Sequence, residues 1–364
     1  MSATEVPRAT PAPVVSPRSY IHPRTLTVLG TYKCTAACTN CCFDSNPSLT
    51  QRLALEDIVK FIDEGSRYQS LQLVVFSGGE CFLLGDDLAR AVEFAARKNL
   101  RTRCVTNGYW AKSLEHGRRR LRQLKDAGLC ELNISTGDFH QKYVDAETVV
   151  NAACLGVEHE LDYTLLMVEL QTERRVTAAS LLEIPRLRAL ARAEAGARFK
   201  IIESPWMPMS ADEVIAQPSE RTLSQENAPH RHGCQSVLST IVVTPARKIG
   251  FCCGLSRELI PELNAQWNDV ELAALLAEAG RDFMKIWLFV DGPERILAWA
   301  ASKNPQIDWQ GRYAHHCHAC LALFQNGVIR QTIVKHYRER VDDVLMRYSV
   351  LLRGQELLED AVYA

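Results

Sequence analysis

The chain has 364 residues, with 42 Lys or Arg against 43 Asp or Glu, and its formal net charge at pH 7 is −1. This length exceeds the usual limit of about 250 to 300 residues for a single core, which predicts one large domain and a smaller one. The balanced charge argues against a general nucleic-acid binder, because such domains carry a basic surplus. With no apolar run near the roughly 20 residues of a membrane span and no hydrophobic signal core, we expect a cytoplasmic protein with neither a membrane nor a nucleic-acid partner.

The first 22 residues are rich in Pro, Ser, Thr and Ala and predict a disordered leader. After them, strand-like and helix-like segments alternate up to residue 207. The six predicted strands are Thr25–Leu29, Leu71–Phe76, Thr102–Thr106, Leu129–Ser135, Leu161–Val168 and Phe199–Glu203. The predicted helices between them are Leu55–Ser66, Asp86–Lys98, Leu114–Ala127, Ala146–Leu155 and Ala178–Ala193. This alternation predicts an α/β fold with a parallel sheet, a partial (β/α)6 TIM-like barrel over residues 23–207.

Three cysteines follow the first predicted strand in the segment Cys34-Thr-Ala-Ala-Cys38-Thr-Asn-Cys41. A cubane of four irons takes one outer ligand per iron, so three thiolates leave one iron open. The same spacing also fits three small buried residues on one face of a helix. A zinc site would need a fourth ligand, and no second pair lies nearby. Cys42 is a further thiol, but Cys41 fits the spacing better.

Short polar or glycine-rich segments also follow the next three predicted strands. They are Ser77-Gly78-Gly79-Glu80, Thr106-Asn107-Gly108 and Ser135-Thr136-Gly137-Asp138. Because the carboxyl ends of parallel strands meet at one edge of a barrel, we expect all of them on one rim with the cysteines. A glycine pair permits positive φ and a close approach of a ligand to the backbone. Each segment by itself also fits an ordinary turn.

Together, the cysteine spacing and these segments resemble the radical S-adenosylmethionine (SAM) superfamily. The resemblance implies a [4Fe-4S] cluster on Cys34, Cys38 and Cys41, whose open iron binds SAM and cleaves it reductively to a 5′-deoxyadenosyl radical. The cofactor-binding residues that it implies are Gly78, Gly79 and Glu80 for the SAM amino group, Asn107, Ser135 for the SAM carboxylate or ribose, and Asp138. The chain departs from the family pattern at two places. Asn40 stands where an aromatic residue usually precedes the third cysteine, and Gly137 and Asp138 are exchanged.

The alternation ends near residue 207, and a connector over residues 208–231 leads to a second pattern at 232–325. Cys234 is followed by a β-rich run, Val237–Thr244, then by Cys252-Cys253 and a distant pair, Cys317 and Cys320. This region resembles the auxiliary-cluster domain called SPASM, or its shortened twitch form. The resemblance implies one auxiliary [4Fe-4S] cluster, with Cys252 preferred to Cys253, and a hairpin turn built differently because Arg247 replaces the usual glycine. A Cys₄ zinc site remains a competing interpretation.

Other residues receive weaker predictions. Glu169, Glu203 and Trp206 lie at later strand ends and are candidates for a substrate cavity. Five histidines near the second cysteine group are either hydrogen-bond partners of a cluster, a replacement ligand or loop residues: His230, His232, His315, His316 and His318. The other cysteines are predicted to be small core residues, namely Cys42, Cys81, Cys104, Cys130, Cys154 and Cys253. Residues 326–364 predict one or two amphipathic helices.

The resemblance implies a radical enzyme that abstracts hydrogen from its substrate and receives electrons from a donor such as flavodoxin or ferredoxin. We expect modification of a ribosomally made peptide, assisted by the auxiliary cluster. Two alternatives stay open at the level of sequence. One is a radical dehydrogenase of a small molecule such as an aminosugar or cyclitol, and the other is a non-catalytic metal-cluster protein.

Overall fold

The computed structural model describes residues 21–39, 41–170, 174–193, 198–205, 209–213, 217, 219–252, 259–267 and 271–363, with side chains up to residue 354. Six parallel strands form the main part of its sheet. They are β1 (Thr25–Leu29), β2 (Leu73–Ser77), β3 (Arg101–Thr106), β4 (Glu131–Thr136), β5 (Tyr163–Leu170) and β6 (Phe199–Pro205). The order β6-β5-β4-β3-β2-β1 follows the chain, which confirms the α/β fold with a partial (β/α)6 barrel.

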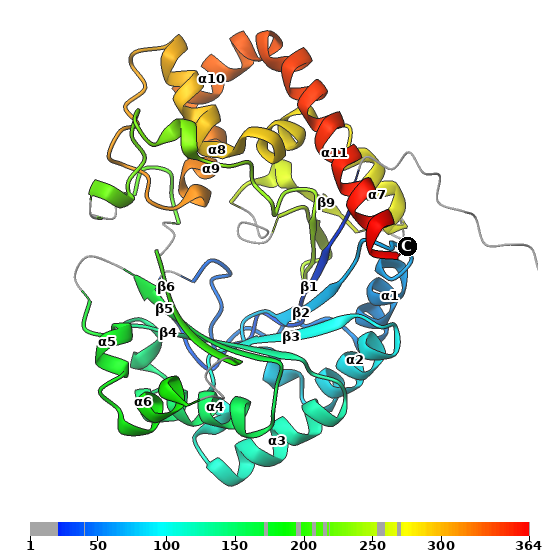
Figure 1. Cartoon of the computed structure of the whole chain (residues 1–364), viewed down its shortest axis with the longest axis vertical. Coiled ribbons are helices and arrows are strands. Elements are labelled where there is room, and N and C mark those ends of the chain that lie inside the picture. The colour runs from blue at the N-terminus through cyan, green and yellow to red at the C-terminus, as the bar shows by residue number, and fades with distance from the viewer. Residues whose placement is uncertain are drawn as a thin grey trace, which may run out of the picture.

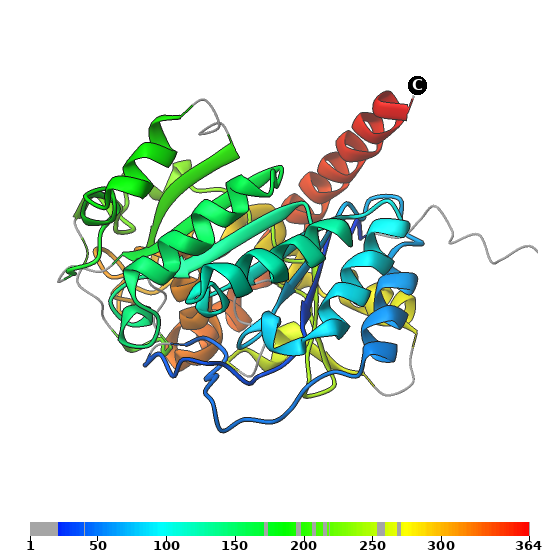
Figure 2. The same cartoon turned by 90° about the horizontal axis from the view of Figure 1, so that it is seen from below.

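Helices cover the outer face of this sheet, as Figures 1 and 2 show. They are α1 (Leu55–Gly65), α2 (Asp86–Arg97), α3 (Leu114–Asp126), α4 (Ala146–Glu158), α5 (Ala178–Leu181) and α6 (Pro185–Arg192). Each helix packs through an apolar face. In α1 this face is formed by Ile58, Phe61 and Ile62, which are fully buried. Short 3-10 turns η1 (Cys81–Leu84), η2 (Tyr109–Ala111) and η3 (His140–Lys142) follow β2, β3 and β4.

The prediction of one continuous helix over Ala178–Ala193 is wrong. The segment forms α5 and α6, and Ile184 between them has extended backbone angles, φ −69° and ψ 118°. Pro185 explains the break, because its ring disfavours the helical conformation of the preceding residue and suits the first position of a new helix.

The predicted hairpin of the second half continues the barrel sheet. Strand β7 (Thr240–Val243) pairs in parallel with β1, and β8 (Lys248–Gly250) and β9 (Asn264–Gln266) follow it in antiparallel order. The turn between β7 and β8 has Arg247 at the position of the glycine that is usual in the family, and this arginine adopts φ 58°. A side chain in this left-handed region costs on the order of 1 kcal/mol. The guanidinium of Arg247 lies 5.3 Å from the ring centre of Trp267, a contact that offsets part of this cost.

The C-terminal half is mainly helical and lies across the opening of the barrel from the outer helices (Figure 1). Its helices are α7 (Leu272–Ala279), α8 (Phe283–Lys303), α9 (His316–Gln325), α10 (Gly327–His336) and α11 (Val341–Tyr363), with 3-10 turns η5 (Ser219–Arg221), η6 (Ala228–His230), η7 (Pro261–Leu263) and η8 (Tyr337–Arg340). The last two helices confirm the helical tail, and α11 projects from the body in Figure 2. None of the described helices has the length and apolarity to cross a membrane.

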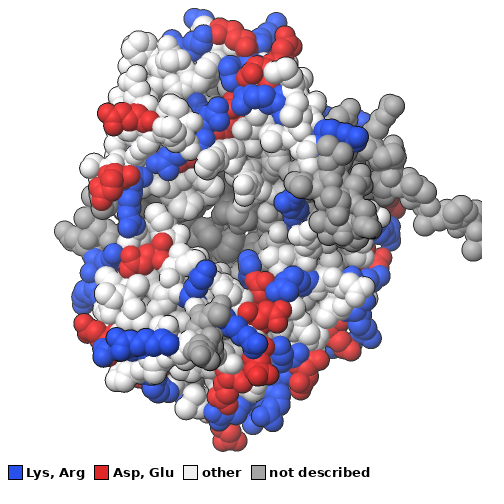
Figure 3. Space-filling view, in the orientation of Figure 1, with Lys and Arg blue, Asp and Glu red and all other residues white. Residues whose placement is uncertain are grey.

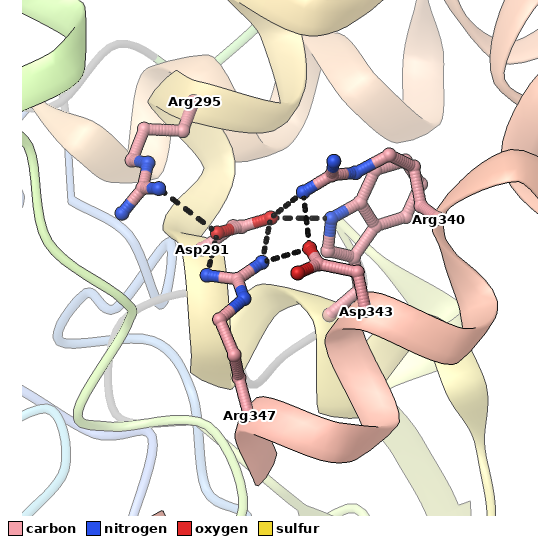
Figure 4. A network of polar contacts seen from close by, with 6 residues as sticks. Asp291, Arg295, Arg340, Asp343 and Arg347 are labelled. Atoms are coloured by element: carbon pink, nitrogen blue, oxygen red, sulfur yellow. Dashed lines mark hydrogen bonds and ion pairs between the residues drawn. The ribbon is translucent and has the colours of Figure 1, made fainter.

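A buried carboxylate joins α8 to α11 (Figure 4). Asp291 is 4% exposed and accepts hydrogen bonds from Trp287 Nε1 at 2.8 Å and from Arg347 Nη1 at 2.8 Å. Arg340 and Arg295 approach the same carboxylate at 3.3 and 3.4 Å. Burial by itself raises the pKa of Asp291. The hydrogen bonds and charges of its partners, chiefly Arg347 and Trp287, outweigh this effect, so the pKa lies below its usual value. This network fixes α11 against the kink of α8 at Gly292, where φ is 77°.

Between the barrel and the C-terminal helices, the face shown in Figure 3 is hollowed. Lys and Arg are interspersed with Asp and Glu over this face, and most atoms at the edge of the hollow are uncharged (Figure 3). The mixed surface matches the balanced formal charge of the whole chain.

Candidate functional site

The glycine pair after β2 lies against the backbone that leads into the cysteine segment. Gly79 N donates to Thr31 O at 2.7 Å, and Glu80 N donates to Lys33 O at 2.9 Å. A Cβ on Gly79 would stand 2.3 Å from Lys33 O, and a Cβ on Gly78, where φ is 139°, would stand 2.4 Å from Thr31 O. Only glycine permits this approach. The turn therefore fixes the chain directly before Cys34.

A cavity of about 280 Å³ opens beside this contact at the carboxyl ends of β1 to β4. Its lining brings together most of the residues predicted to bind the cluster and SAM. These are Cys34, Cys38, Cys41, Gly78, Gly79, Asn107 and Ser135. The lining also includes Cys42 and His140. The prediction that the strand-end motifs share one rim is thus confirmed for these residues.

The described residues between Cys34 and Cys41 form a loop rather than a helix, so the interpretation of three core residues on one helical face is wrong. Cys41 N donates to Cys38 O at 3.2 Å, which bends the loop around the cavity. Asn107 Nδ2 approaches Cys34 Sγ at 3.6 Å and donates to Thr35 Oγ1 at 3.0 Å. The end of β3 therefore supports the loop from the opposite side.

Two thiols of this loop, Cys34 and Cys38, are weaker acids than a free thiol. Burial raises the pKa of Cys34 to about 11 and that of Cys38 to about 12, and the neighbouring thiols add to both shifts. Binding of a metal centre would release these protons, because thiolate is the ligand form.

Glu80 lies behind the cavity and is not part of its lining. Its side chain is fully buried, and its carboxylate accepts hydrogen bonds from Thr106 Oγ1 at 2.8 Å, Asn107 N at 2.9 Å and Phe82 N at 3.0 Å. Burial raises its pKa to about 7 against the opposing effect of these bonds. In this structure Glu80 holds the end of β3 against the glycine turn and so positions Asn107.

The segment after β4 places its acidic residue differently from the prediction. Asp138 is outside the cavity lining, and its carboxylate accepts from Arg175 N at 3.0 Å. Gly137 has φ 147°, and a Cβ there would stand 1.9 Å from Glu169 Cγ. The exchange of Gly137 and Asp138 relative to the family pattern therefore makes room for Glu169 of β5.

Glu169 in turn supports a residue that the sequence predictions did not include. The carboxylate of Glu169 accepts from Phe139 N at 2.5 Å, and its other oxygen lies 3.3 Å from His140 Nδ1. The only signal in the sequence was the position of His140, five residues after Ser135 at a strand end. The other predicted acid, Glu203, accepts from Ala178 N at 3.0 Å and pairs with Arg174 at 3.2 Å. Asn40 and Trp206 lie outside the described residues.

The second cysteine group is assembled from three separate segments. Cys234, Cys252 and Cys320 are 7 to 8% exposed. Burial raises the pKa of Cys320 well above its usual value, and the nearby thiols of Cys252 and Cys234 raise it further. Cys317 lies in the first turn of α9 and is half-buried, and Cys253 lies outside the described residues. The structure therefore brings Cys234, Cys252 and Cys320 together.

The histidines near this group differ in their surroundings. His230 ends the 3-10 turn η6 and His232 lies in a loop, and both are exposed. His318 is buried, with Nε2 3.3 Å from Ala211 O and its ring against Tyr313. His315 accepts from Cys317 N through Nδ1 at 3.1 Å, and burial lowers its pKa to about 4, which keeps it neutral. His315 therefore caps the helix that carries the last two cysteines.

Of the remaining cysteines, Cys81 and Cys104 are fully buried as predicted, while Cys130 and Cys154 are half-buried. Cys42 differs from its prediction, because it lines the cavity. Across the described parts of the chain, no three His, Cys, Asp or Glu side chains converge as ligands of one metal ion. The thiolates of a cubane bind different irons, and thiol sulfurs are the donors that iron–sulfur clusters take. The loop thiols around one cavity fit this chemistry.

Comparison with known proteins agrees with this arrangement. Residues 28–150 match the model of the Radical SAM superfamily, and this part of the chain is a Radical SAM domain. The putative peptide biosynthesis protein YydG of Bacillus subtilis is 27% identical over 131 residues, which are 36% of this chain. The chain thus matches about 40% of the length of this curated relative.

Two solved structures are also similar to the chain. The structure of anSMEcpe with bound AdoMet and the Cp18Cys peptide superposes with a TM-score of 0.51 at 11% identity, over 90% of this chain and 99% of that one. Streptococcus suis SuiB bound to the precursor peptide SuiA gives a TM-score of 0.42 at 11% identity, over 70% of this chain and 64% of that one. The first of these supports the fold over nearly the whole chain.

Proposed function

We propose that the protein is a radical SAM enzyme that reductively cleaves SAM and abstracts a hydrogen atom from a ribosomally made peptide. The observation that carries this proposal is the cavity of about 280 Å³, which gathers Cys34, Cys38 and Cys41 beside Gly78 and Gly79. Three thiols leave one iron of a cubane without a protein ligand, and the glycine turn offers backbone groups beside it.

The roles of the chain's residues follow from their contacts. Cys34, Cys38 and Cys41 would hold a [4Fe-4S] cluster, which when loaded supplies the electron that cleaves SAM. Asn107 supports the loop through Thr35 and is held in place by the carboxylate of Glu80. Ser135 also lines the cavity and is a candidate donor to SAM.

The second cysteine group would hold one auxiliary [4Fe-4S] cluster. Its proposed ligands are Cys234, Cys252, Cys317 and Cys320. The proximity of Cys252 to Cys234 and Cys320 supports Cys252 rather than Cys253. A cluster with four protein ligands would accept an electron from a substrate radical, and flavodoxin or ferredoxin would reduce the SAM cluster.

Peptide substrates are supported by the relatives. YydG is named a putative peptide biosynthesis protein, and the anSMEcpe structure holds a peptide. The hollow between the barrel and the C-terminal helices in Figure 3 is where we expect an extended substrate to bind.

The test begins with anaerobic reconstitution of the full chain with iron and sulfide. After reduction with dithionite, the protein should convert SAM to 5′-deoxyadenosine and methionine, measured by liquid chromatography. Candidate precursor peptides are then added, and their mass is measured before and after reaction. A change in peptide mass, or deuterium uptake from heavy water without other mass change, supports peptide modification.

Three other outcomes would contradict parts of this proposal. Absence of SAM cleavage by protein with an intact cluster would indicate a non-catalytic cluster protein. Cleavage that is stimulated by an aminosugar or cyclitol, but not by peptides, would indicate a small-molecule dehydrogenase. A content of four irons and one zinc per chain would show that the second cysteine group binds zinc rather than an auxiliary cluster.

A further inference from the structure

A separate cavity of about 390 Å³ lies in the C-terminal half of the chain. It is formed by the segment around η6, by helix α8 and by the loop over residues 304–315 that leads to α9. Its described lining residues all differ from those of the cavity at the loop cysteines. Ligand cavities measure about 300 to 1,000 Å³, so this one has room for a small group rather than for a long peptide.

The described lining of this cavity contains one cation and no carboxylate. The cation is Arg295 of α8, and beside it lie the indole of Trp309 and the side-chain amides of Gln225 and Gln310. Oε1 of Gln310 accepts from Gln225 N at 3.1 Å, so the amide N–H groups of Gln310 remain for another partner. The indole N–H of Trp309 has no hydrogen-bond partner within the described parts of the chain. The lining thus offers several donors to an acceptor.

The charge of Arg295 is only partly balanced by the network of Figure 4. This network contains three guanidinium groups and two carboxylates, and therefore one positive charge in excess. The groups belong to Arg295, Arg340 and Arg347 and to Asp291 and Asp343. Arg295 Nη2 reaches Asp291 Oδ1 only at 3.4 Å, and Figure 4 shows its other terminal nitrogen pointing away from Asp291. Arg295 therefore gives the cavity a net positive charge.

Another cavity of the C-terminal half, of about 310 Å³, provides a contrast. Both cations of its described lining pair with acids of the same lining. Lys285 Nζ lies 2.5 Å from Asp282 Oδ2. Arg330 Nη2 lies 3.1 Å from Glu262 Oε1. Since its charges are balanced, an anion should prefer the cavity at Arg295.

The other walls of the cavity at Arg295 are largely apolar, with Ala228 and Pro229 on one side and Ala298 and Ala301 of α8 on the other. A carboxylate on an aliphatic stem fits both parts. A guanidinium binds carboxylate oxygens through parallel N–H bonds, and apolar walls cover the stem. A phosphate group, with a charge of about −2, would remain partly unbalanced by one surplus cation.

We propose that this cavity binds a carboxylate of the peptide substrate, held by Arg295 and by the N–H groups of Trp309 and Gln310. The inference rests on the proposed function, which makes the ligand a peptide. Because the loop cysteines line a different cavity, this contact recognises the peptide and takes no part in the radical chemistry. The carboxylate belongs either to an acidic side chain or to the end of the peptide chain, and the experiment separates these two sources.

Nuclear magnetic resonance of the tryptophan indoles measures binding at this site. The reconstituted, oxidised full chain is labelled with ¹⁵N-tryptophan, and Trp309→Phe identifies the Trp309 signal among the six tryptophans. Acetyl-Leu-Glu-Leu-amide carries a side-chain carboxylate, acetyl-Leu-Gln-Leu carries one at the chain end, and acetyl-Leu-Gln-Leu-amide carries none. In titrations up to about 10 mM, we expect a saturable shift of the Trp309 signal with at least one carboxylate peptide and no shift with the neutral peptide.

Arg295→Gln should weaken binding of the carboxylate peptide by about tenfold or more, because it removes the charge-assisted hydrogen bonds. Arg330→Gln, in the cavity with balanced charges, is the matched control and should equal the wild type. If the remaining indole signals show that Arg295→Gln does not fold, the comparison of carboxylate and neutral peptides on the wild type decides by itself.

Equal shifts with the carboxylate and neutral peptides, or no shift with any of them, would overturn the proposal. An unchanged affinity in folded Arg295→Gln would do the same. The titration requires neither SAM nor a reductant, so its result is independent of the proposed radical reaction. Carboxylate binding without SAM cleavage would reject the proposed function and keep the site, whereas SAM cleavage without carboxylate binding would reject the site alone.

Discussion

The two cysteine groups are built in opposite ways. Cys34, Cys38 and Cys41 come from a single loop and face a cavity shared with the ends of β2, β3 and β4. Cys234, Cys252 and Cys320 come from distant segments and belong to the buried core of the C-terminal half. An open set of three leaves room for an exchangeable ligand, while a closed set favours a centre with protein ligands only. Under the proposed function, the open set would hold the cluster that binds SAM, and the buried set would hold the auxiliary cluster.

The largest expected effect comes from removing the loop thiols. Replacing Cys34, Cys38 and Cys41 together with Ala should abolish SAM cleavage, because no other described loop presents three thiols to the cavity. Iron should fall from about eight to about four per chain, the content of one cubane. Formation of 5′-deoxyadenosine and iron content are the measurements. Retained cleavage would refute the assignment of this cluster.

Removing a buried thiol of the second group should have the converse result. Cys320→Ala should lower iron to about four per chain while the SAM cluster stays, since the two groups share no ligand. Reductive SAM cleavage without peptide should persist. The matched control is Cys253→Ala, which should keep its full iron content. Loss of half the iron in Cys253→Ala would show that Cys253, rather than Cys252, is the ligand of the auxiliary cluster.

The glycine turn gives an intermediate effect. Gly79→Ala would place a Cβ 2.3 Å from Lys33 O, and relief of such a clash costs about 1 to 3 kcal/mol. Because the displaced backbone leads into Cys34, we expect a several-fold loss of SAM affinity with the second cluster intact. Gly327→Ala is the control, because nothing lies within 4 Å of its Cβ position. Equal SAM affinity in the two variants would show that the close approach at Gly79 has no role in the site.

The smallest expected effect concerns the network of Figure 4. Asp291→Asn should lower the free energy of unfolding by on the order of 2 kcal/mol, because buried bonds to arginines and Trp287 are weakened. Asp343→Asn, at a more exposed carboxylate, should cost less. Thermal unfolding measures both, and SAM cleavage should be unaffected. A loss of SAM cleavage in Asp291→Asn would show that the two halves are coupled.

The same network makes the free energy of unfolding depend on pH. The pKa of Asp291 is lowered in the folded protein, so its contribution is present above the unfolded value of about 3.9 and is lost as pH falls through the folded value. Unfolding curves of the wild type and Asp291→Asn should therefore converge at low pH. A difference between the two proteins that does not shrink as pH falls below the unfolded pKa would contradict this origin.

Local pattern predicted the barrel closely. Strand β1 begins and ends at the predicted residues, Thr25 and Leu29, and every predicted strand of the barrel is present. Apolar periodicity sufficed because each strand and helix buries its own face against its neighbour in the chain. The wrong prediction of a continuous helix over Ala178–Ala193 also has a local cause, because Pro185, which breaks the helix, is visible in the sequence. The sheet connection of β7 with β1 could not be predicted, because pairing between distant segments leaves no local pattern.

By itself, the sequence determined which residue types follow each strand, and hence that thiols, glycines and polar groups meet on one rim. Chain order and the handedness of the crossovers suffice for that result. Tertiary structure decided which of these side chains face the cavity. Glu80 and Asp138 bond to backbone elsewhere, and His140 and Glu169 meet across two strands, because a side chain's direction depends on the space and partners that distant segments provide.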